Sequence, residues 1–101
     1  MINTARKGLK LERKAELELQ AEGCRTWKKI RVRYLNNDIF GLFDLLALPE
    51  DGRKLRMIQV KANYCRPEVR EAIRDLKVPS SIQKEVWTWK DRVGWKKEII
   101  E

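Results

Sequence analysis

Histidine is absent from the sequence, and its absence excludes several kinds of catalytic site. A Ser-His-Asp triad, a Cys-His nucleophile pair and a His-ligated zinc or iron centre all need an imidazole ring. Cysteine is scarce as well, because Cys24 and Cys65 are the two in the chain and form no CxxC pair for a zinc ribbon. Any catalysis must therefore use carboxylates, lysine, tyrosine, cysteine or a bound hard metal ion.

Long apolar segments are missing too. The stretch Met1–Gly8 is polar and lacks the apolar region of a signal peptide. The longest apolar-rich run, Ile39–Pro49, is interrupted by Asp44 and is too short to span a bilayer. We interpret the two cysteines as free buried thiols, which suits a reducing compartment. These features predict a soluble, cytoplasmic protein that has no membrane partner.

Positive charge is what the chain has in excess. It contains 23 Lys and Arg against 15 Asp and Glu, a net charge of +8. An excess of this size in a chain of 101 residues indicates a polyanionic partner, most simply nucleic acid. The length fits one domain over residues 1–101, large enough for a single hydrophobic core.

The hydrophobic pattern predicts two helices and five strands in the order α-β-β-β-α-β-β. The first helix carries an apolar stripe of Leu11, Ala15 and Leu19, and Gly23 stands where a helix-ending glycine belongs. The predicted elements are the helix Ala5–Glu22, the strands Cys24–Leu35, Ile39–Leu48 and Leu55–Ala62, the helix Pro67–Leu76, and a hairpin of Glu85–Lys90 and Trp95–Ile100. This order predicts an α/β fold, in which a central mixed sheet is flanked by helices.

Polar residues interrupt the two central apolar strands. Asp44 lies in the first of them, where an unpaired carboxylate is costly. Gln59 and Lys61 lie two positions apart in the second, so their side chains leave the same face. If the strands pair across the turn Pro49–Gly52, the three polar groups come together.

Glu12 could add a carboxylate to this group, because it borders the buried stripe of the first helix. Carboxylate and amide oxygens are hard donors that suit Mg²⁺ or Mn²⁺. A metal held by them can lower the pKa of a bound water and stabilise charge on a phosphate. Lys61 could orient that water or offset charge on the phosphorus.

A purely structural interpretation is open for each of these residues. Asp44 could pair with Lys61 inside the sheet, and Glu12 with a basic neighbour on its helix. Asp38 could cap a turn, support a metal ligand or act as an alternative one. Taken singly, the structural interpretation is favoured, but the co-occurrence of polar groups on one helix and two adjacent apolar strands favours a site.

Three short motifs resemble those of one nuclease superfamily. The stretch Lys7–Arg13 matches an opening-helix pattern of Lys-Gly-x-x-x-Glu-Arg, and Asp44 is followed by the apolar run Leu45–Ala47. Gln59-Val60-Lys61 matches a (D/E)xK strand. Over about the first two-thirds of the chain, the sequence resembles the PD-(D/E)xK nuclease superfamily. Within it, the likeness is to small archaeal and viral Holliday-junction-resolvase-like endonucleases.

The resemblance implies a restriction-endonuclease-like core and a metal-dependent DNA endonuclease that hydrolyses phosphodiester bonds. It leaves the DNA substrate open: the enzyme could be structure-specific for Holliday junctions or other branched DNA, and a junction, a flap, a nicked duplex and a specific site are all candidates. The implied cofactor is Mg²⁺ or Mn²⁺, with no other small-molecule cofactor, and the host could be a virus-infected archaeal cell. The implied catalytic residues are Glu12, Asp44, Gln59 and Lys61, and the implied metal ligands are Glu12, Asp44, Gln59 and the Val60 carbonyl.

Two positions depart from the superfamily pattern. Phe43 replaces a proline that commonly precedes the aspartate, a change that the superfamily tolerates. Gln59 replaces an acidic residue, which removes one negative charge and should weaken metal affinity. Because some active relatives carry glutamine there, activity is not excluded.

Basic residues near the aromatic Trp27 predict a DNA-facing surface, because lysine and arginine contact phosphates. Solvated side chains that cover apolar surface are the structural alternative. Lys84 and Lys90, beside Trp87 and Trp89, could contact phosphates as well. The predicted DNA-binding residues are Arg6, Lys7, Lys10, Trp27, Lys28, Lys29, Arg31 and Arg33.

Paired cuts on opposing strands need two sites related by a two-fold axis, so we expect a homodimer. Ile39, Phe40 and the Trp-rich hairpin are candidates for its interface. Two other functions are open: a non-catalytic nucleic-acid-binding module on the same fold, and a small RNA-binding or ribosome-associated basic protein.

Overall fold

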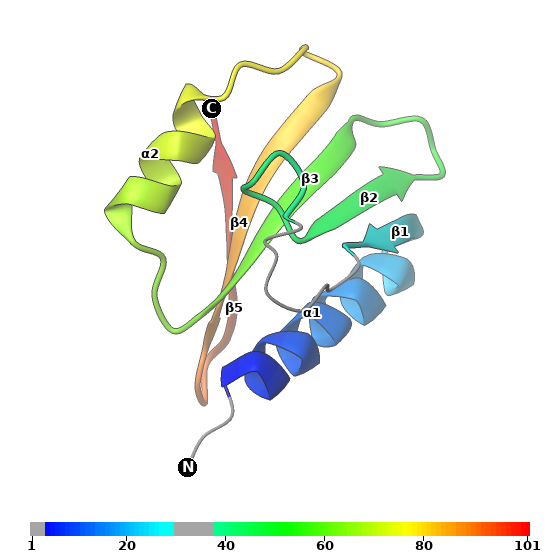
Figure 1. Cartoon of the computed structure of the whole chain (residues 1–101). Helices are drawn as coiled ribbons and strands as arrows, with labels where there is room; N and C mark the ends of the chain where they lie inside the picture. Colours follow the sequence, from blue (N-terminus) through cyan, green and yellow to red (C-terminus); the bar gives the residue numbers. More distant parts are fainter. Residues whose placement is uncertain (1–3, 30–37) are drawn as a thin grey trace.

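Five strands and two helices form the described part of the chain, residues 4–29 and 38–101 of a computed structural model (Figure 1). Their order is the predicted α-β-β-β-α-β-β. The elements are α1 (Thr4–Ala21), β1 (Cys24–Lys28), β2 (Leu45–Pro49), β3 (Leu55–Ala62), α2 (Pro67–Asp75), β4 (Ile82–Lys90) and β5 (Gly94–Ile100).

The strands form one mixed sheet in the order β1-β2-β3-β4-β5. The pair β3 and β4 is parallel, and the other neighbouring pairs are antiparallel. Parallel neighbours need a crossover connection, and α2 supplies it between β3 and β4 (Figure 1). The predicted α/β fold with a central mixed sheet is confirmed.

Two hydrophobic clusters cover opposite faces of the sheet. The α1 cluster joins Ala15 and Leu19 to Ile58 of β3 and Trp87 of β4. The α2 cluster joins Ile73 to Met57, Val86 and Ile100. Ile58 and Met57 are consecutive in β3, as are Trp87 and Val86 in β4. Consecutive strand residues point to opposite faces, so α1 and α2 flank the sheet from either side.

The predicted bounds of the first helix and of β3 agree closely with the structure. α1 ends at Ala21, and Gly23 follows with a φ of +91°, the left-handed conformation that glycine adopts readily after a helix. Burial of Leu11, Ala15 and Leu19 fixes the face of α1 that packs on the sheet.

The predicted strand Ile39–Leu48 is wrong over its first half, because Ile39–Asp44 forms a tight turn. The amide groups of Ile39 and Phe43 donate to each other's carbonyl oxygens at 2.7 and 3.0 Å. Phe40 and Gly41 adopt positive φ angles of 54° and 72°, which no extended strand contains. Asp44 therefore precedes β2 instead of lying inside it.

The predicted strand Cys24–Leu35 is described only as far as β1 and Lys29. Its remainder, with Arg31 and Arg33, lies outside the described residues. The described helices include none that is long and apolar enough to cross a membrane.

Lys84, which the sequence leaves open to a phosphate contact or a structural role, has a structural role. It is buried, and its Nζ donates to the carbonyl oxygens of Ile73 and Leu76 at 2.7 Å and of Arg74 at 3.1 Å. These carbonyls end α2, where a helix leaves its acceptors unsatisfied. Lys84 is thus an internal cap of α2.

The tryptophans of the last hairpin form an aromatic cluster. The Trp95 ring lies 5.5 Å from the Trp87 ring and 5.2 Å from the Trp89 ring, centroid to centroid. Trp87 is fully buried and Trp95 packs on the α1 cluster. These rings therefore close the core on the α1 face.

Candidate catalytic site

Asp44 is held between β1 and β3 at the point where β2 begins. Its N–H donates to the Ile58 carbonyl at 2.9 Å, and its own carbonyl accepts from the Lys29 N–H at 3.0 Å. β2 pairs with β3 so that Leu45 lies opposite Ile58. One further step in this register places Asp44 opposite Gln59. The sequence-predicted meeting of these two strands is therefore present around Asp44.

Both carboxylate oxygens of Asp44 are engaged, and the residue is only 4% exposed. Oδ2 accepts a hydrogen bond from the Val60 N–H at 2.8 Å. Oδ1 lies 2.6 Å from the Nζ of Lys29. The predicted structural alternative for Asp44 was an ion pair with Lys61, but its partner in the sheet is Lys29.

Lys29 also contacts Asp38, so one ammonium bridges two carboxylates. Its side chain is 12% exposed. Burial alone would lower the pKa of Lys29, but the hydrogen bonds and attraction from Asp38 and Asp44 outweigh burial and raise it. Lys29 therefore keeps its charge and directs it at the candidate site rather than at solvent.

Gln59 and Lys61 extend from β3 on the face opposite Val60, which packs on the α1 cluster. Gln59 is 5% exposed, and its Oε1 finds no hydrogen-bond partner within the described part of the chain. Lys61 is half-buried and pairs in register with Thr88 of β4. Gln59 and Lys61 thus share one face of β3, and Asp44 stands next to that strand at the start of β2.

Glu12 lies on α1, which packs on the face of the sheet opposite Gln59 and Lys61. It is 3% exposed beside Leu11. Farther along α1, the Nζ of Lys14 lies 4.1 Å from the centre of the Trp89 ring, and Trp89 pairs with Ala62. The first half of α1 therefore runs along the end of β3 that carries Lys61. A metal ligand at Glu12 would have to reach this end of the strand.

The donor set fits a hard divalent cation. The described residues contain no cluster of three His, Cys, Asp or Glu side chains. A metal at Asp44 would therefore depend on few carboxylates and on neutral oxygens. The buried Gln59 Oε1, an acceptor with no hydrogen bond among the described residues, is an oxygen of that kind.

The predicted DNA-binding residues have different environments. Lys10 is exposed, Lys28 is half-buried, and Trp27 is 51% exposed on the sheet. Lys7 lies 3.9 Å from Asp91, at the turn between β4 and β5. The side chain of Arg6 and all of Arg31 and Arg33 lie outside the described part.

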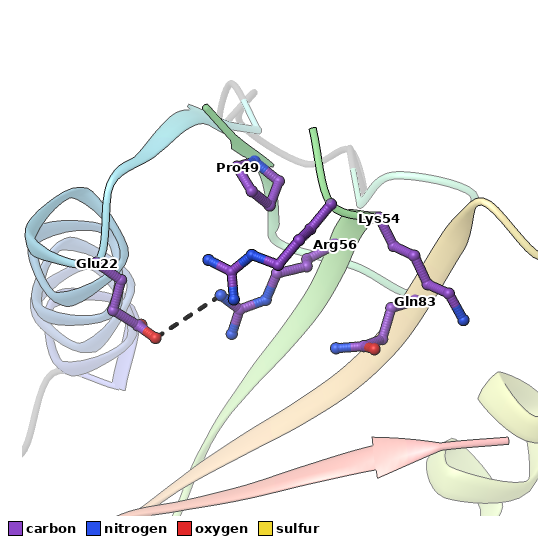
Figure 2. A pocket seen from close by; sticks show the side chains of 6 residues that line it. Glu22, Pro49, Lys54, Arg56 and Gln83 are labelled. Carbon is purple, nitrogen blue, oxygen red and sulfur yellow. Dashed lines mark ion pairs between the residues drawn. The ribbon is translucent and has the colours of Figure 1, made fainter. Parts of the chain in front are cut away.

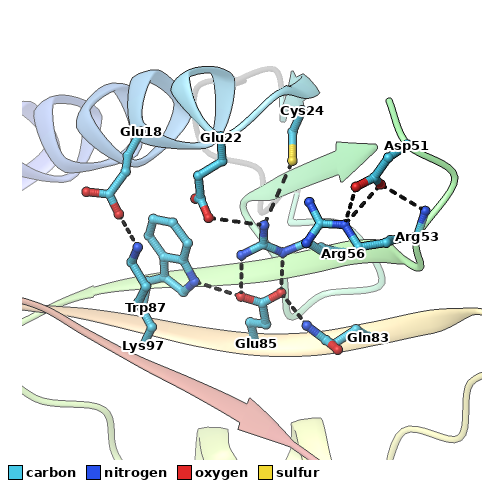
Figure 3. Close-up of polar contacts among 10 residues, drawn as sticks. All are labelled: Glu18, Glu22, Cys24, Asp51, Arg53, Arg56, Gln83, Glu85, Trp87 and Lys97. Atoms are coloured by element: carbon cyan, nitrogen blue, oxygen red, sulfur yellow. Dashed lines mark hydrogen bonds and ion pairs between the residues drawn. The ribbon is translucent and has the colours of Figure 1, made fainter. Parts of the chain in front are cut away.

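A basic hollow lies at the opposite end of β3 from Lys61. It has a volume of about 480 Å³ and is lined by Glu22, Pro49, Arg53, Lys54, Arg56 and Gln83 (Figure 2). The charge of Arg56 is already balanced, because its Nη1 lies 3.8 Å from Glu22 and its Nε 2.6 Å from Glu85. Arg53 pairs with Asp51 at 2.7 Å. The two arginines of this hollow therefore belong to structural ion pairs (Figure 3).

The five-stranded mixed sheet has one parallel pair and a helix packed on each of its faces. The structure is similar to that of Hjc, a Holliday junction resolvase from the archaeal hyperthermophile Archaeoglobus fulgidus, with a TM-score of 0.63 and 21% identity. The match covers 93% of this chain and 73% of that chain. Neither protein-family models nor curated protein sequences give a match. The predicted resemblance is therefore confirmed as a likeness of fold.

Proposed function

We propose that the protein is a metal-dependent endonuclease that hydrolyses phosphodiester bonds in DNA, with a preference for branched DNA such as Holliday junctions. One observation carries the proposal. On a fold similar to that of a resolvase, the Asp44 carboxylate accepts a hydrogen bond from the Val60 N–H, in the middle of Gln59-Val60-Lys61. A buried aspartate beside such a strand can supply a carboxylate ligand to a hard cation, which promotes phosphodiester hydrolysis.

The residues have distinct roles in this proposal. Glu12, Asp44, Gln59 and the Val60 carbonyl would hold Mg²⁺ or Mn²⁺, which supplies a water of lowered pKa and stabilises charge on the phosphate. Lys61, on the same face of β3 as Gln59, orients the attacking water and offsets charge on the phosphorus. The Val60 N–H fixes the direction of the Asp44 carboxylate.

The oligomeric state of the proposed enzyme follows from its chemistry. One chain of this size provides one site, and paired cuts require two sites related by a two-fold axis. We therefore propose a single nuclease-like domain that acts as a homodimer on DNA. Phe40, which is 73% exposed on the turn before Asp44, is the best-placed candidate for the interface.

A cleavage panel tests the function. Four-way junctions, flaps, nicked duplexes and intact duplexes are incubated with Mg²⁺ or Mn²⁺ and the wild type, Asp44→Asn or Lys61→Ala. Loss of a group that stabilises transition-state charge should slow cleavage by about 10²–10³-fold, while DNA binding is largely retained. Lys54→Ala is the control, because Lys54 is exposed at the other end of β3. If Asp44→Asn and Lys61→Ala cut as fast as the wild type, the site is wrongly assigned.

A non-catalytic nucleic-acid-binding module on the same fold is the second candidate. Two observations favour it: Gln59 stands where the superfamily has an acid, and Lys29 neutralises Asp44. This candidate predicts salt-sensitive binding of DNA and no cleavage with either metal. The same panel therefore separates the two functions.

A further inference from the structure

The ammonium of Lys29 lies where a cation is needed. Its Nζ is 2.6 Å from Asp44 Oδ1 and also contacts Asp38 Oδ1. Asp44 is 4% exposed, and an unpaired buried carboxylate is costly. In this state of the protein, Lys29 supplies a positive charge next to the buried carboxylate of Asp44.

The contacts of Asp44 leave little room for a second cation. Its Oδ2 already accepts from the Val60 N–H, and its Oδ1 is occupied by Lys29. A Mg²⁺ ligand oxygen lies about 2.1 Å from the metal, so an ammonium on the same carboxylate would face the dication at close range. Repulsion between two cations is strong where burial limits screening by water. Metal and Lys29 should therefore exclude each other at Asp44.

We propose, on the basis of the function proposed above, that Lys29 is an internal counter-ion that a divalent metal displaces from Asp44. Lys29 stabilises the metal-free protein, and it leaves the Asp44 carboxylate when the metal binds. It is thus a positioning residue that sets the apparent metal affinity. A ligand that must displace a bound group has a reduced apparent affinity. That affinity is its intrinsic affinity multiplied by the fraction of molecules in which the group is already absent.

Lys29→Met tests the exchange, because methionine keeps much of the side-chain bulk and removes the charge. Binding of Mn²⁺, without DNA, is measured by electron paramagnetic resonance for the wild type, Lys29→Met, Asp44→Asn and the exposed control Lys54→Met. We expect Lys29→Met to bind Mn²⁺ about tenfold more tightly than the wild type. Lys54→Met should match the wild type, and Asp44→Asn should lose the binding.

Thermal unfolding supplies a second readout. In chelator, Lys29→Met should unfold at a lower temperature than Lys54→Met, since Asp44 has lost its counter-charge. Mn²⁺ should then raise the unfolding temperature of Lys29→Met by more than it raises that of the wild type. If Lys29→Met does not fold, Lys29→Gln replaces it, because glutamine retains a hydrogen-bond donor without the charge.

The outcomes separate this inference from the function on which it rests. If Lys29→Met binds Mn²⁺ no more tightly than the wild type while Asp44→Asn abolishes binding, the exchange is wrong and the metal site stands. If Asp44→Asn binds Mn²⁺ as the wild type does, the metal site itself is wrong, and the exchange fails with it.

Discussion

Glu85 lies in the middle of β4, where a buried carboxylate must be paired to remain ionised. The Nε and Nη2 of Arg56, on the neighbouring β3, donate to its two oxygens at 2.6 and 3.0 Å (Figure 3). Trp87 Nε1 and Gln83 Nε2 donate to it at 2.9 and 3.0 Å. Burial alone would raise the pKa of Glu85, but these hydrogen bonds, led by Arg56, outweigh it and lower the pKa. The ion pair therefore contributes to stability through the ionised form.

Glu85→Gln should remove part of the decrease in the free energy of unfolding that acidification causes. Because the folded-state pKa lies below the ordinary 4.5, the contribution of Glu85 is complete above pH 4.5 and is lost as pH falls through the folded-state value. At about pH 7, Glu85→Gln should lower the free energy of unfolding by about 3 kcal/mol, since it removes the buried and closer of the two carboxylates that pair with Arg56. Urea unfolding from about pH 7 to about pH 3 should show this difference narrowing below pH 4.5.

Glu71→Gln is the matched control, because Glu71 is exposed on α2. It should change the free energy of unfolding little at any pH. A difference between Glu85→Gln and the wild type that stays constant on acidification would contradict the role given to the ionised Glu85.

At the level of single residues, the sequence predicts part of the candidate site. Asp44, Gln59 and Lys61 are recognisable because each is a polar residue among apolar neighbours, and the shared face of Gln59 and Lys61 follows from strand periodicity. The pairing of Lys29 with Asp38 and Asp44 is not recognisable in the same way. It depends on the register of β1 against β2 and on the turn before Asp44, which bring residues together that no local spacing connects.

The C-terminal end of α2 is stabilised from another element. Lys84 of β4 donates to three carbonyl oxygens at this end, those of Ile73, Arg74 and Leu76. The sequence of α2 supplies a single basic residue, Arg74, in its last turn. The buried ammonium of β4 therefore satisfies acceptors that the helix leaves open.

Lys84→Met should destabilise α2 from this end. The variant keeps the buried stem but leaves the carbonyls without their charged donor, so we expect a loss of about 2 kcal/mol in the free energy of unfolding. Hydrogen exchange at the amides of Ile73 and Leu76 should become faster, because this turn opens more often. Lys77→Met, at an exposed neighbouring lysine, is the control and should leave both quantities unchanged. Equal exchange rates in the two variants would show that Lys84 is not the cap.

At the level of elements, periodicity predicts those that pack with one clear face. The bounds of β3 are predictable because turns flank the strand. The bounds of α2 are predictable because Pro67 begins the helix and its apolar face is regular. The run Ile39–Phe43 resembles a strand in the sequence because its residues are apolar. Its turn is specified instead by cross-turn hydrogen bonds and by left-handed Phe40 and Gly41, and a bulky residue rarely adopts that conformation.

Across the whole molecule, the excess of positive charge is divided between internal and exposed groups. Lys29, Arg56 and Lys84 serve carboxylates or carbonyls inside the fold. Arg70 is paired with Glu98 of β5. Since only exposed cations can contact phosphates, DNA binding should depend on position more than on total charge. The first half of α1, with exposed Lys10, lies along the end of β3 that carries Lys61.

A comparison of two single variants, Lys10→Ala and Lys77→Ala, tests this dependence. Each variant removes one positive charge, and both lysines are exposed. Lys77 follows α2, near the start of β4, while Lys10 lies toward the end of the sheet where the candidate site is. The logarithm of the DNA-binding constant should fall linearly with the logarithm of salt concentration, with a slope of about −0.9 for each phosphate contact. Lys10→Ala should make this slope shallower by about one contact and weaken binding to every sequence alike. Lys77→Ala should retain the wild-type slope in fluorescence-anisotropy titrations. Equal slopes for the two variants would mean that net charge alone governs binding, and that the first half of α1 does not face the DNA.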